Sequence, residues 1–85
     1  MNILFEQEAF EELQEWVSTD KKIFKKIVEL IRNISRSPYE GLGKPEPLKY
    51  NYGGYWSRRI TQEDRLIYKI DDSTIVIISC KGHYD

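Results

Sequence analysis

The sequence is poor in the residues that most often build metal sites and disulfides. Cys80 is the only cysteine and His83 the only histidine among 85 residues. One cysteine cannot form an intramolecular disulfide, and one cysteine with one histidine leaves a structural zinc site short of ligands. We therefore expect neither a bound metal nor a cofactor.

Long apolar runs, internal repeats and low-complexity segments are absent as well. The start, MNILFEQEAF, has no basic segment, and its apolar run is too short for a signal peptide or a membrane span. We expect a cytoplasmic protein without membrane contact, folded as one domain over residues 1–85. The chain also has no excess of positive charge, because its formal net charge is -1. Binding to nucleic acid would therefore depend on local charge.

Positive charge is concentrated in the middle of the chain. From Lys44 to Arg59 there are four cations and one acid, a local balance of +3. The acid is Glu46, which stands between two prolines. A carboxylate on a stiff segment with cations on both sides suits phosphate chemistry. The four cations are Lys44, Lys49, Arg58 and Arg59.

Two helices are predicted near the start of the chain, where apolar residues recur at helical spacing. The first begins at about Gln7. The second follows Asp20, which can cap it, and should end before Pro38. Their short connection predicts an antiparallel helix hairpin. The basic run at residues 21–26 is interpreted as the solvated face of the second helix.

After Pro38 the apolar pattern changes to period two, which predicts strands. We expect strands over residues 2–5, 55–61, 65–70 and 74–81, with a shorter one near 48–51. The strands after Pro38 should be successively antiparallel. The face packed on the helices should hold Trp56, Ile60, Leu66, Tyr68, Val76 and Ile78. The other face, left for a ligand, should hold Ser57, Arg59, Arg65, Ile67 and Lys69.

These residues suggest cleavage of RNA. RNA carries its own nucleophile, the 2′-hydroxyl beside the scissile phosphate, so an enzyme without metal needs a base, cations and an acid. Glu46 can be the base. His83, with a reference pKa near ~6.5, can be the acid, and Tyr84 offers a ring on which a base could stack. The cations that can hold the phosphorane charge are Lys49, Arg59 and Arg65.

Each candidate residue also has an interpretation in which it takes no part in catalysis or RNA binding. Glu46 alone could be a solvent-exposed loop acid, and the three arginines could form the wet side of strands. A histidine near a terminus is often a surface residue, and Tyr84 could pack on the sheet edge. Because spacing in sequence does not place these groups within hydrogen-bond reach, the residues alone leave both interpretations open.

Four blocks of sequence closely resemble the YoeB family of toxins, within the wider RelE-like group. The blocks are GKPEPLK at 43–49, GYWSRRI at 54–60, RLIY at 65–68 and GHY at 82–84. The resemblance spans essentially the whole chain. It implies an α+β fold of the microbial-RNase type, in which an N-terminal helix hairpin packs on a curved antiparallel sheet.

The resemblance also implies an activity and roles for residues. It implies a toxin of a type II toxin–antitoxin system, a metal-independent endoribonuclease that cuts mRNA at the ribosomal A site and so inhibits translation. By the match, Glu46 is the general base, His83 the general acid, and Arg65 and Tyr84 the phosphate and base contacts. The implied RNA- or phosphate-binding residues around them are Lys44, Lys49, Arg58 and Arg59.

The implied partners are a YefM-like antitoxin, mRNA and the ribosome, with operator DNA bound only through the antitoxin complex. Toxins of this kind can also form homodimers. The alternative is a non-catalytic RelE-like scaffold that binds antitoxin and operator DNA as a co-repressor; the joint presence of Glu46, Arg65 and His83 argues against it. A plain RNA-binding domain would carry an exposed aromatic ladder on its strands, and that ladder is lacking.

Overall fold

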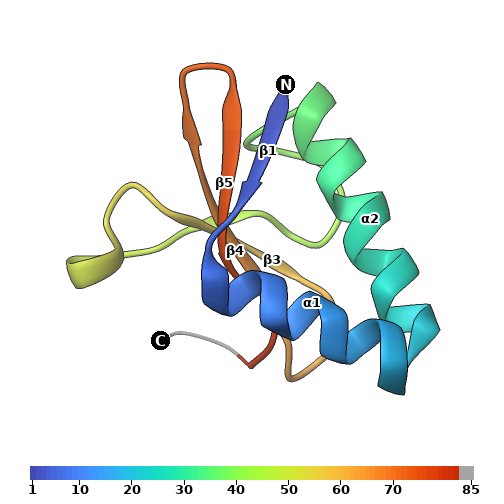
Figure 1. Cartoon of the computed structure of the whole chain (residues 1–85). Coiled ribbons are helices and arrows are strands. Elements are labelled where there is room, and N and C mark those ends of the chain that lie inside the picture. The colour runs from blue at the N-terminus through green and yellow to red at the C-terminus, as the bar shows by residue number, and fades with distance from the viewer. Residues whose placement is uncertain (83–85) are drawn as a thin grey trace.

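In the computed structural model, which describes residues 1–82, two helices pack on one face of a five-stranded sheet (Figure 1). The strand order is β1-β5-β4-β3-β2. This arrangement confirms the predicted α+β class. In chain order the elements are β1 (Asn2–Phe5), α1 (Gln7–Thr19), α2 (Lys21–Arg36), β2 (Glu46–Pro47), the 3-10 turn η1 (Tyr50–Tyr52), β3 (Trp56–Arg59), β4 (Arg65–Asp71) and β5 (Thr74–Ser79).

The two helices form as the sequence predicts, and they diverge from a short connection (Figure 1). Asp20 caps α2, because its Oδ1 accepts hydrogen bonds from the backbone N–H groups of Lys22 at 3.1 Å and Ile23 at 3.3 Å. The helix ends at Arg36, two residues before Pro38. Its buried residues recur every three or four positions and are Ile27, Leu30, Ile31 and Ile34. No helix within residues 1–82 is long and apolar enough to cross a membrane.

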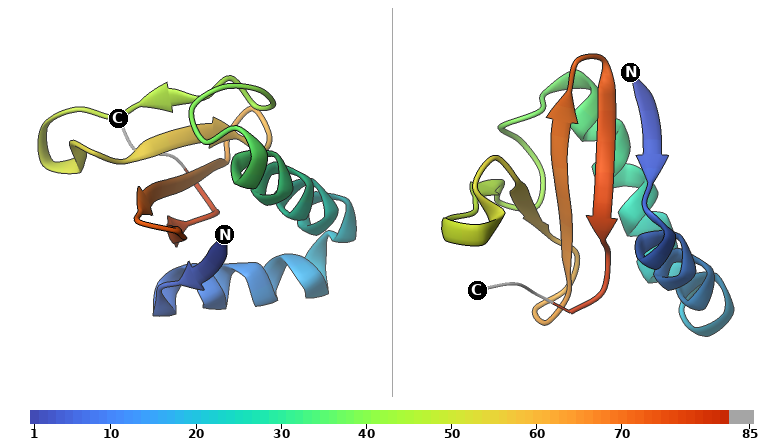
Figure 2. Two further views of the ribbon diagram at one scale, coloured as in Figure 1. Left: turned by 90° about the horizontal axis from the view of Figure 1, so that it is seen from above. Right: turned by 60° about the vertical axis from the view of Figure 1, so that its left-hand side comes forward.

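The sheet is mixed, so the expectation of a purely antiparallel sheet is wrong at one strand. β3, β4 and β5 pair antiparallel as predicted, whereas β1 runs parallel to β5, with Ile3 opposite Ile75. Figure 2 shows β1 as an outer strand beside β5, with β2 and β3 toward the opposite edge. Alternation of apolar residues identifies a strand but carries no information about its direction.

The short strand predicted near residues 48–51 is also wrong. The extended residues are Glu46 and Pro47, and η1 follows them. Tyr50 has a φ of 58°, in the left-handed region, which a strand cannot contain. Glu46 therefore lies in an edge strand, opposite Ser57 of β3, rather than in a loop.

In β5 the predicted buried face is wrong as well. The core cluster takes Ile75 and Ile77 from this strand rather than Val76 and Ile78. Pairing with β4 decides this, because Ile77 lies opposite the core residue Tyr68. Residues 75–78 are all apolar, so their period-two pattern fits either face equally well.

Candidate active site

Strand pairing brings three of the predicted site residues to one face of the sheet. Glu46 lies opposite Ser57 and Arg59 lies opposite Arg65, while Ser57 and Arg59 are two residues apart on β3. Opposed residues of an antiparallel pair share a face, and so do residues two apart on one strand. The intervening Leu66 packs in the core beneath the helices. These four side chains therefore lie on the face turned away from the helices, which we call the open face.

Arg59 and Arg65 form a close cross-strand pair of like charge. The backbone N–H of Arg59 donates to the carbonyl of Gly43 at 2.6 Å, and the backbone N–H of Arg65 donates to the carbonyl of Gly82 at 2.7 Å. The two arginines therefore form no backbone hydrogen bond with each other. The Cα atoms of such non-hydrogen-bonded pairs are only about 4.5 Å apart, and like charges placed there repel. Neither arginine forms an ion pair within residues 1–82. A bound anion would relieve this repulsion.

The Arg65 guanidinium is oriented by the turn that precedes it. Its Nη1 donates to the carbonyl oxygens of Thr61 at 2.8 Å, Gln62 at 3.1 Å and Asp64 at 3.1 Å. Across the part of the chain that the structure describes, all hydrogen bonds of this guanidinium use Nη1. The group is therefore held at one nitrogen, and Nε and Nη2 keep their donors for a ligand.

Glu46 is the acid that β2 contributes to the open face. It is exposed, and it is the diagonal neighbour of Arg59 across the pairing, a relation that spans about 7–8 Å. Lys44 and Lys49 are exposed on either side of β2. The arrangement presents one carboxylate beside a group of cations, as a base next to a phosphate site requires.

Arg58 is not on the surface, which corrects its assignment as a phosphate-binding residue. Its side chain is 0% exposed, because position 58 alternates with the open-face residues Ser57 and Arg59 and so points toward the helices. All five of its N–H donors are used within the protein. The acceptors are the Tyr68 hydroxyl, the Asn33 side-chain oxygen and the carbonyls of Leu42, Ser37 and Glu40.

These hydrogen bonds make Arg58 the anchor of the segment that leads to Glu46. Three acceptors are carbonyls of residues 37–42, and no carboxylate pairs with the guanidinium among the described residues. Gly43 allows this segment to lie close to β3. Its φ is 79°, and a Cβ there would lie 3.0 Å from the Arg59 carbonyl oxygen. The buried arginine thereby fixes where β2 enters the sheet.

His83 and Tyr84, predicted as general acid and base contact, lie outside the described residues. The residue before them is fixed beside Arg65. The Gly82 N–H donates to Asp64 Oδ1 at 2.8 Å, and its carbonyl accepts from the Arg65 N–H. The described chain thus ends at the Arg65 end of β4, and His83 is the next residue in the sequence.

Helix α1 holds the residues that lead from β5 to Gly82. Glu12 accepts from the Cys80 N–H at 2.8 Å and from the Ser79 hydroxyl at 3.2 Å, and the Trp16 indole N–H donates to the Cys80 carbonyl at 2.8 Å. Lys81 pairs with Glu15 at 2.7 Å. Burial raises the pKa of Glu12 above its usual value, and burial raises the pKa of Cys80 to about 12.

Sequence reasoning missed two features of this region. The first is Tyr55: Lys69, which was expected on the open face, places its ammonium 5.3 Å from the centre of the Tyr55 ring and so brings an aromatic group beside that face. Asp64 links the turn at residues 61–65 to Gly82. The spacing Thr61-x-x-Asp64 indicates the turn itself, but no local pattern indicates that the Asp64 carboxylate reaches Gly82. No group of three His, Cys, Asp or Glu suited to a metal occurs within residues 1–82.

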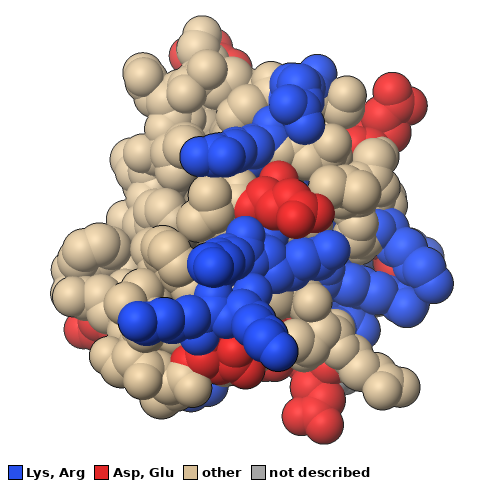
Figure 3. All heavy atoms as spheres, turned by 90° about the vertical axis from the view of Figure 1, so that its right-hand side faces the viewer, with Lys and Arg blue, Asp and Glu red and all other residues tan. Residues whose placement is uncertain are grey.

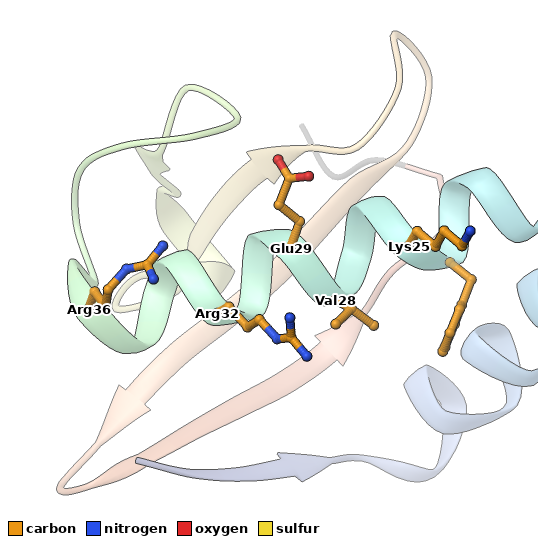
Figure 4. A pocket seen from close by; sticks show the side chains of 6 residues that line it. Lys25, Val28, Glu29, Arg32 and Arg36 are labelled. Carbon is orange, nitrogen blue, oxygen red and sulfur yellow. The ribbon is translucent and has the colours of Figure 1, made fainter.

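A second group of cations lies over α2, away from the open face. Figure 3 shows Lys and Arg side chains gathered on this surface of the molecule. A hollow of about 480 Å³ runs along the helix between these side chains (Figure 4). Residues Phe24, Lys25, Val28, Glu29, Arg32 and Arg36 line it. It shares no residue with the candidate site. In the basic run at residues 21–26, Lys21, Lys22 and Lys25 are exposed, as predicted for a solvated helix face.

Comparison with known proteins assigns the family. A model of the YoeB-like toxin of bacterial type II toxin–antitoxin systems matches residues 5–84. Toxin YoeB of Escherichia coli K12 is 49% identical over 84 residues, which are 99% of this chain and 100% of that toxin. The structure of the YoeB dimer from Staphylococcus aureus is 52% identical, with a TM-score of 0.93 over 99% of this chain and 98% of its own.

The heterotetrameric YoeB–YefM toxin–antitoxin complex from the same species also contains a similar chain. It is 52% identical, with a TM-score of 0.92 over 99% of this chain and 98% of its own. Likeness over the whole length of both proteins, together with the family match, is decisive. This chain therefore belongs to the family of YoeB-like toxins of bacterial type II toxin–antitoxin systems.

Proposed function

We propose that the protein is an endoribonuclease that cuts mRNA at the ribosomal A site without using a metal ion, and that it acts in the cytoplasm. The observation that carries this proposal is the opposed pair Arg59 and Arg65, which has no ion-pair partner within residues 1–82. Two arginines held this close form a site for a phosphate group. Glu46 stands on the same face, one strand away.

The chemistry proceeds by attack of the RNA on itself. Glu46 removes the proton from the 2′-hydroxyl, whose oxygen attacks the neighbouring phosphorus. Negative charge builds on the phosphorane oxygens, and Arg59 and Arg65 stabilise it from fixed positions. The bond to the 5′-oxygen then breaks, and that oxygen takes a proton from His83. The products are a 2′,3′-cyclic phosphate and a 5′-hydroxyl end.

The role of acid for His83 and of base contact for Tyr84 rests on their place in the sequence. His83 follows Gly82, which is hydrogen-bonded to Arg65 and Asp64. It is the only histidine of the chain, and imidazole is the side chain best able to donate a proton near neutral pH. Lys44 and Lys49 supplement the positive charge around the RNA backbone.

The proposed partner is a YefM-like antitoxin, by analogy with the Staphylococcus aureus complex. It would cover the open face and keep RNA out, and the complex, rather than the toxin alone, would bind operator DNA. The dimer of the Staphylococcus aureus relative supports a homodimer as a further assembly. Size-exclusion chromatography with light scattering, with and without antitoxin, measures both states.

The proposal is tested by adding the purified protein to a translating extract and mapping 5′ ends on a defined messenger. Glu46→Gln should lower the rate of cleavage by about 10²-fold or more, because the amide cannot take a proton. Glu46 is exposed, so thermal stability should hardly change. Glu40→Gln, a charge-matched change at another exposed acid, is the control.

Two results would contradict the proposal. Cleavage by Glu46→Gln at the wild-type rate would move the base elsewhere. A wild-type protein that leaves messengers intact, yet binds antitoxin and operator DNA, would support the non-catalytic scaffold instead. Dependence on metal is measured separately, with chelator in an assay in which ribosome integrity is controlled; loss of cleavage that one divalent metal restores would exclude the metal-free mechanism.

A further inference from the structure

Asp64 forms hydrogen bonds within its own turn and one that reaches outside it. Its backbone N–H donates to the Thr61 hydroxyl at 2.9 Å, and the Thr61 hydroxyl donates to Asp64 Oδ2 at 2.8 Å. Its carbonyl accepts from the N–H groups of Ile60 and Thr61 and from Arg65 Nη1. The remaining oxygen, Oδ1, reaches out of the turn and accepts from the Gly82 N–H at 2.8 Å.

We propose that Asp64 is a positioning residue, which holds Gly82 beside Arg65 and thereby fixes the residue to which His83 is attached. The inference rests on the proposed function, since it concerns the placement of the proposed acid relative to the proposed phosphate site. One residue connects the two, through its backbone and its side chain. Asp64 contacts the guanidinium of Arg65 through its carbonyl and holds Gly82 through its carboxylate.

Gly82 depends on these hydrogen bonds because packing does not hold it. It has a φ of 72°, and a Cβ built there would find no atom within 4 Å. The residues before it are fixed by α1, through Glu12, Trp16 and the Lys81–Glu15 ion pair. Gly82 itself has two anchors among the described residues, its N–H on Asp64 and its carbonyl on the Arg65 N–H. Only the first uses a side chain that mutation can remove.

The effect on catalysis should be large for a small displacement. An acid must lie within hydrogen-bond distance of the leaving oxygen, and a misplacement of about 1 Å can cost about 10²-fold in rate. Binding of RNA to Arg59 and Arg65 does not require the acid. Loss of the Asp64 anchor should therefore lower kcat and leave KM nearly unchanged.

The first experiment compares variants in the translating-extract assay. Asp64→Ala should cut at least about 10-fold more slowly than wild type. Asp64→Asn should recover most of the rate, because its amide oxygen can still accept from the Gly82 N–H. Glu63→Ala, which removes the exposed acid next in the same turn, is the matched control and should stay within about 2-fold of wild type.

A second experiment separates positioning from a general structural role. In a His83→Ala background, whose residual rate is followed over long incubations, Asp64→Ala should cause almost no further loss, because the group that it positions is absent. Hydrogen exchange of the Gly82 amide should be faster in Asp64→Ala than in Glu63→Ala. If Asp64→Ala does not fold, Asp64→Glu keeps the charge, displaces the acceptor by one methylene and serves in the same comparisons.

The outcomes distinguish the inference from the proposed function. A wild-type protein without cleavage activity contradicts the proposed function itself. An active wild type with an equally active Asp64→Ala variant overturns the inference alone. If Asp64→Ala lowers the cleavage rate by the same factor in the wild-type and His83→Ala backgrounds, the inference is also overturned. A loss of rate that does not depend on His83 cannot be caused by misplacement of His83.

Discussion

Replacing Arg58 by lysine should destabilise the protein strongly, although the substitution preserves the charge. The guanidinium gives five N–H donors to five acceptors inside the protein, and its side chain is 0% exposed. A lysine ammonium has three donors and no planar fork. At least two of the five acceptors must therefore lose the hydrogen bond that the arginine gives them.

The size of the loss follows from that count. Losing a hydrogen bond from a charged group costs about 1–3 kcal/mol, so losing two of them costs about 2–6 kcal/mol. A chain of 85 residues has a total free energy of unfolding of about 4–13 kcal/mol. With an m-value of about 1 kcal/mol per M, even the smallest of these losses lowers the urea midpoint by about 2 M.

Urea titration followed by tryptophan fluorescence measures this shift. Arg59→Lys is the matched control, because Arg59 is the next residue of β3 and is exposed on the open face. That control should change the free energy of unfolding by less than about 0.5 kcal/mol. Equal urea midpoints for the two lysine variants would refute the reasoning, since the five hydrogen bonds of the Arg58 guanidinium would then contribute nothing measurable.

Three further predictions concern other groups. Arg65→Lys should slow cleavage at least about 10-fold in the translating extract, because one ammonium cannot both keep the Nη1 contacts of the turn and grip two phosphate oxygens. Burial raises the pKa of Glu12 from 4.5, so the protonated carboxyl stabilises the fold fully below pH 4.5, and this stabilisation is lost as pH rises through the pKa of the folded state. In urea titrations at several pH values, Glu12→Gln should make the free energy of unfolding decline less steeply over that range. Cys80, buried and with its pKa raised to about 12, should resist alkylation at pH 8 until urea unfolds the protein; rapid labelling of the folded protein would contradict this.

Local chemistry made much of the fold predictable. The capping oxygen of Asp20 and the proline at position 38 mark the ends of α2 in the sequence as they do in the structure. Alternation along β3 and β4 places Arg59 and Arg65 on one face without knowledge of their partners. The same alternation also places Arg58 on the buried face, between Trp56 and Ile60. Its charge led to the wrong assignment, because sequence does not show the five acceptors that make a buried arginine stable.

The remaining errors concern pairing between distant residues. The parallel direction of β1 depends on β5, more than 70 residues away, and no local pattern encodes it. The buried face of β5 depends on which residue of β4 it meets, including the irregular register at Ile67 and Tyr68. The anchoring of Gly82 joins residues 64 and 82 through one hydrogen bond, which is likewise a product of the complete fold.

The parallel pairing of β1 with β5 has a consequence for the synthesis of the protein. β1 leaves the ribosome well before its partner residues 74–77, which follow it by more than 70 positions in the sequence. Until β5 emerges, β1 has no neighbour in the sheet, and Ile3 and Leu4 have no strand against which to lie. Closing this contact joins residues more than 70 positions apart in the sequence, which makes it a slow step. A nascent chain therefore cannot complete the sheet on which the proposed active site depends until β5 has emerged from the ribosome.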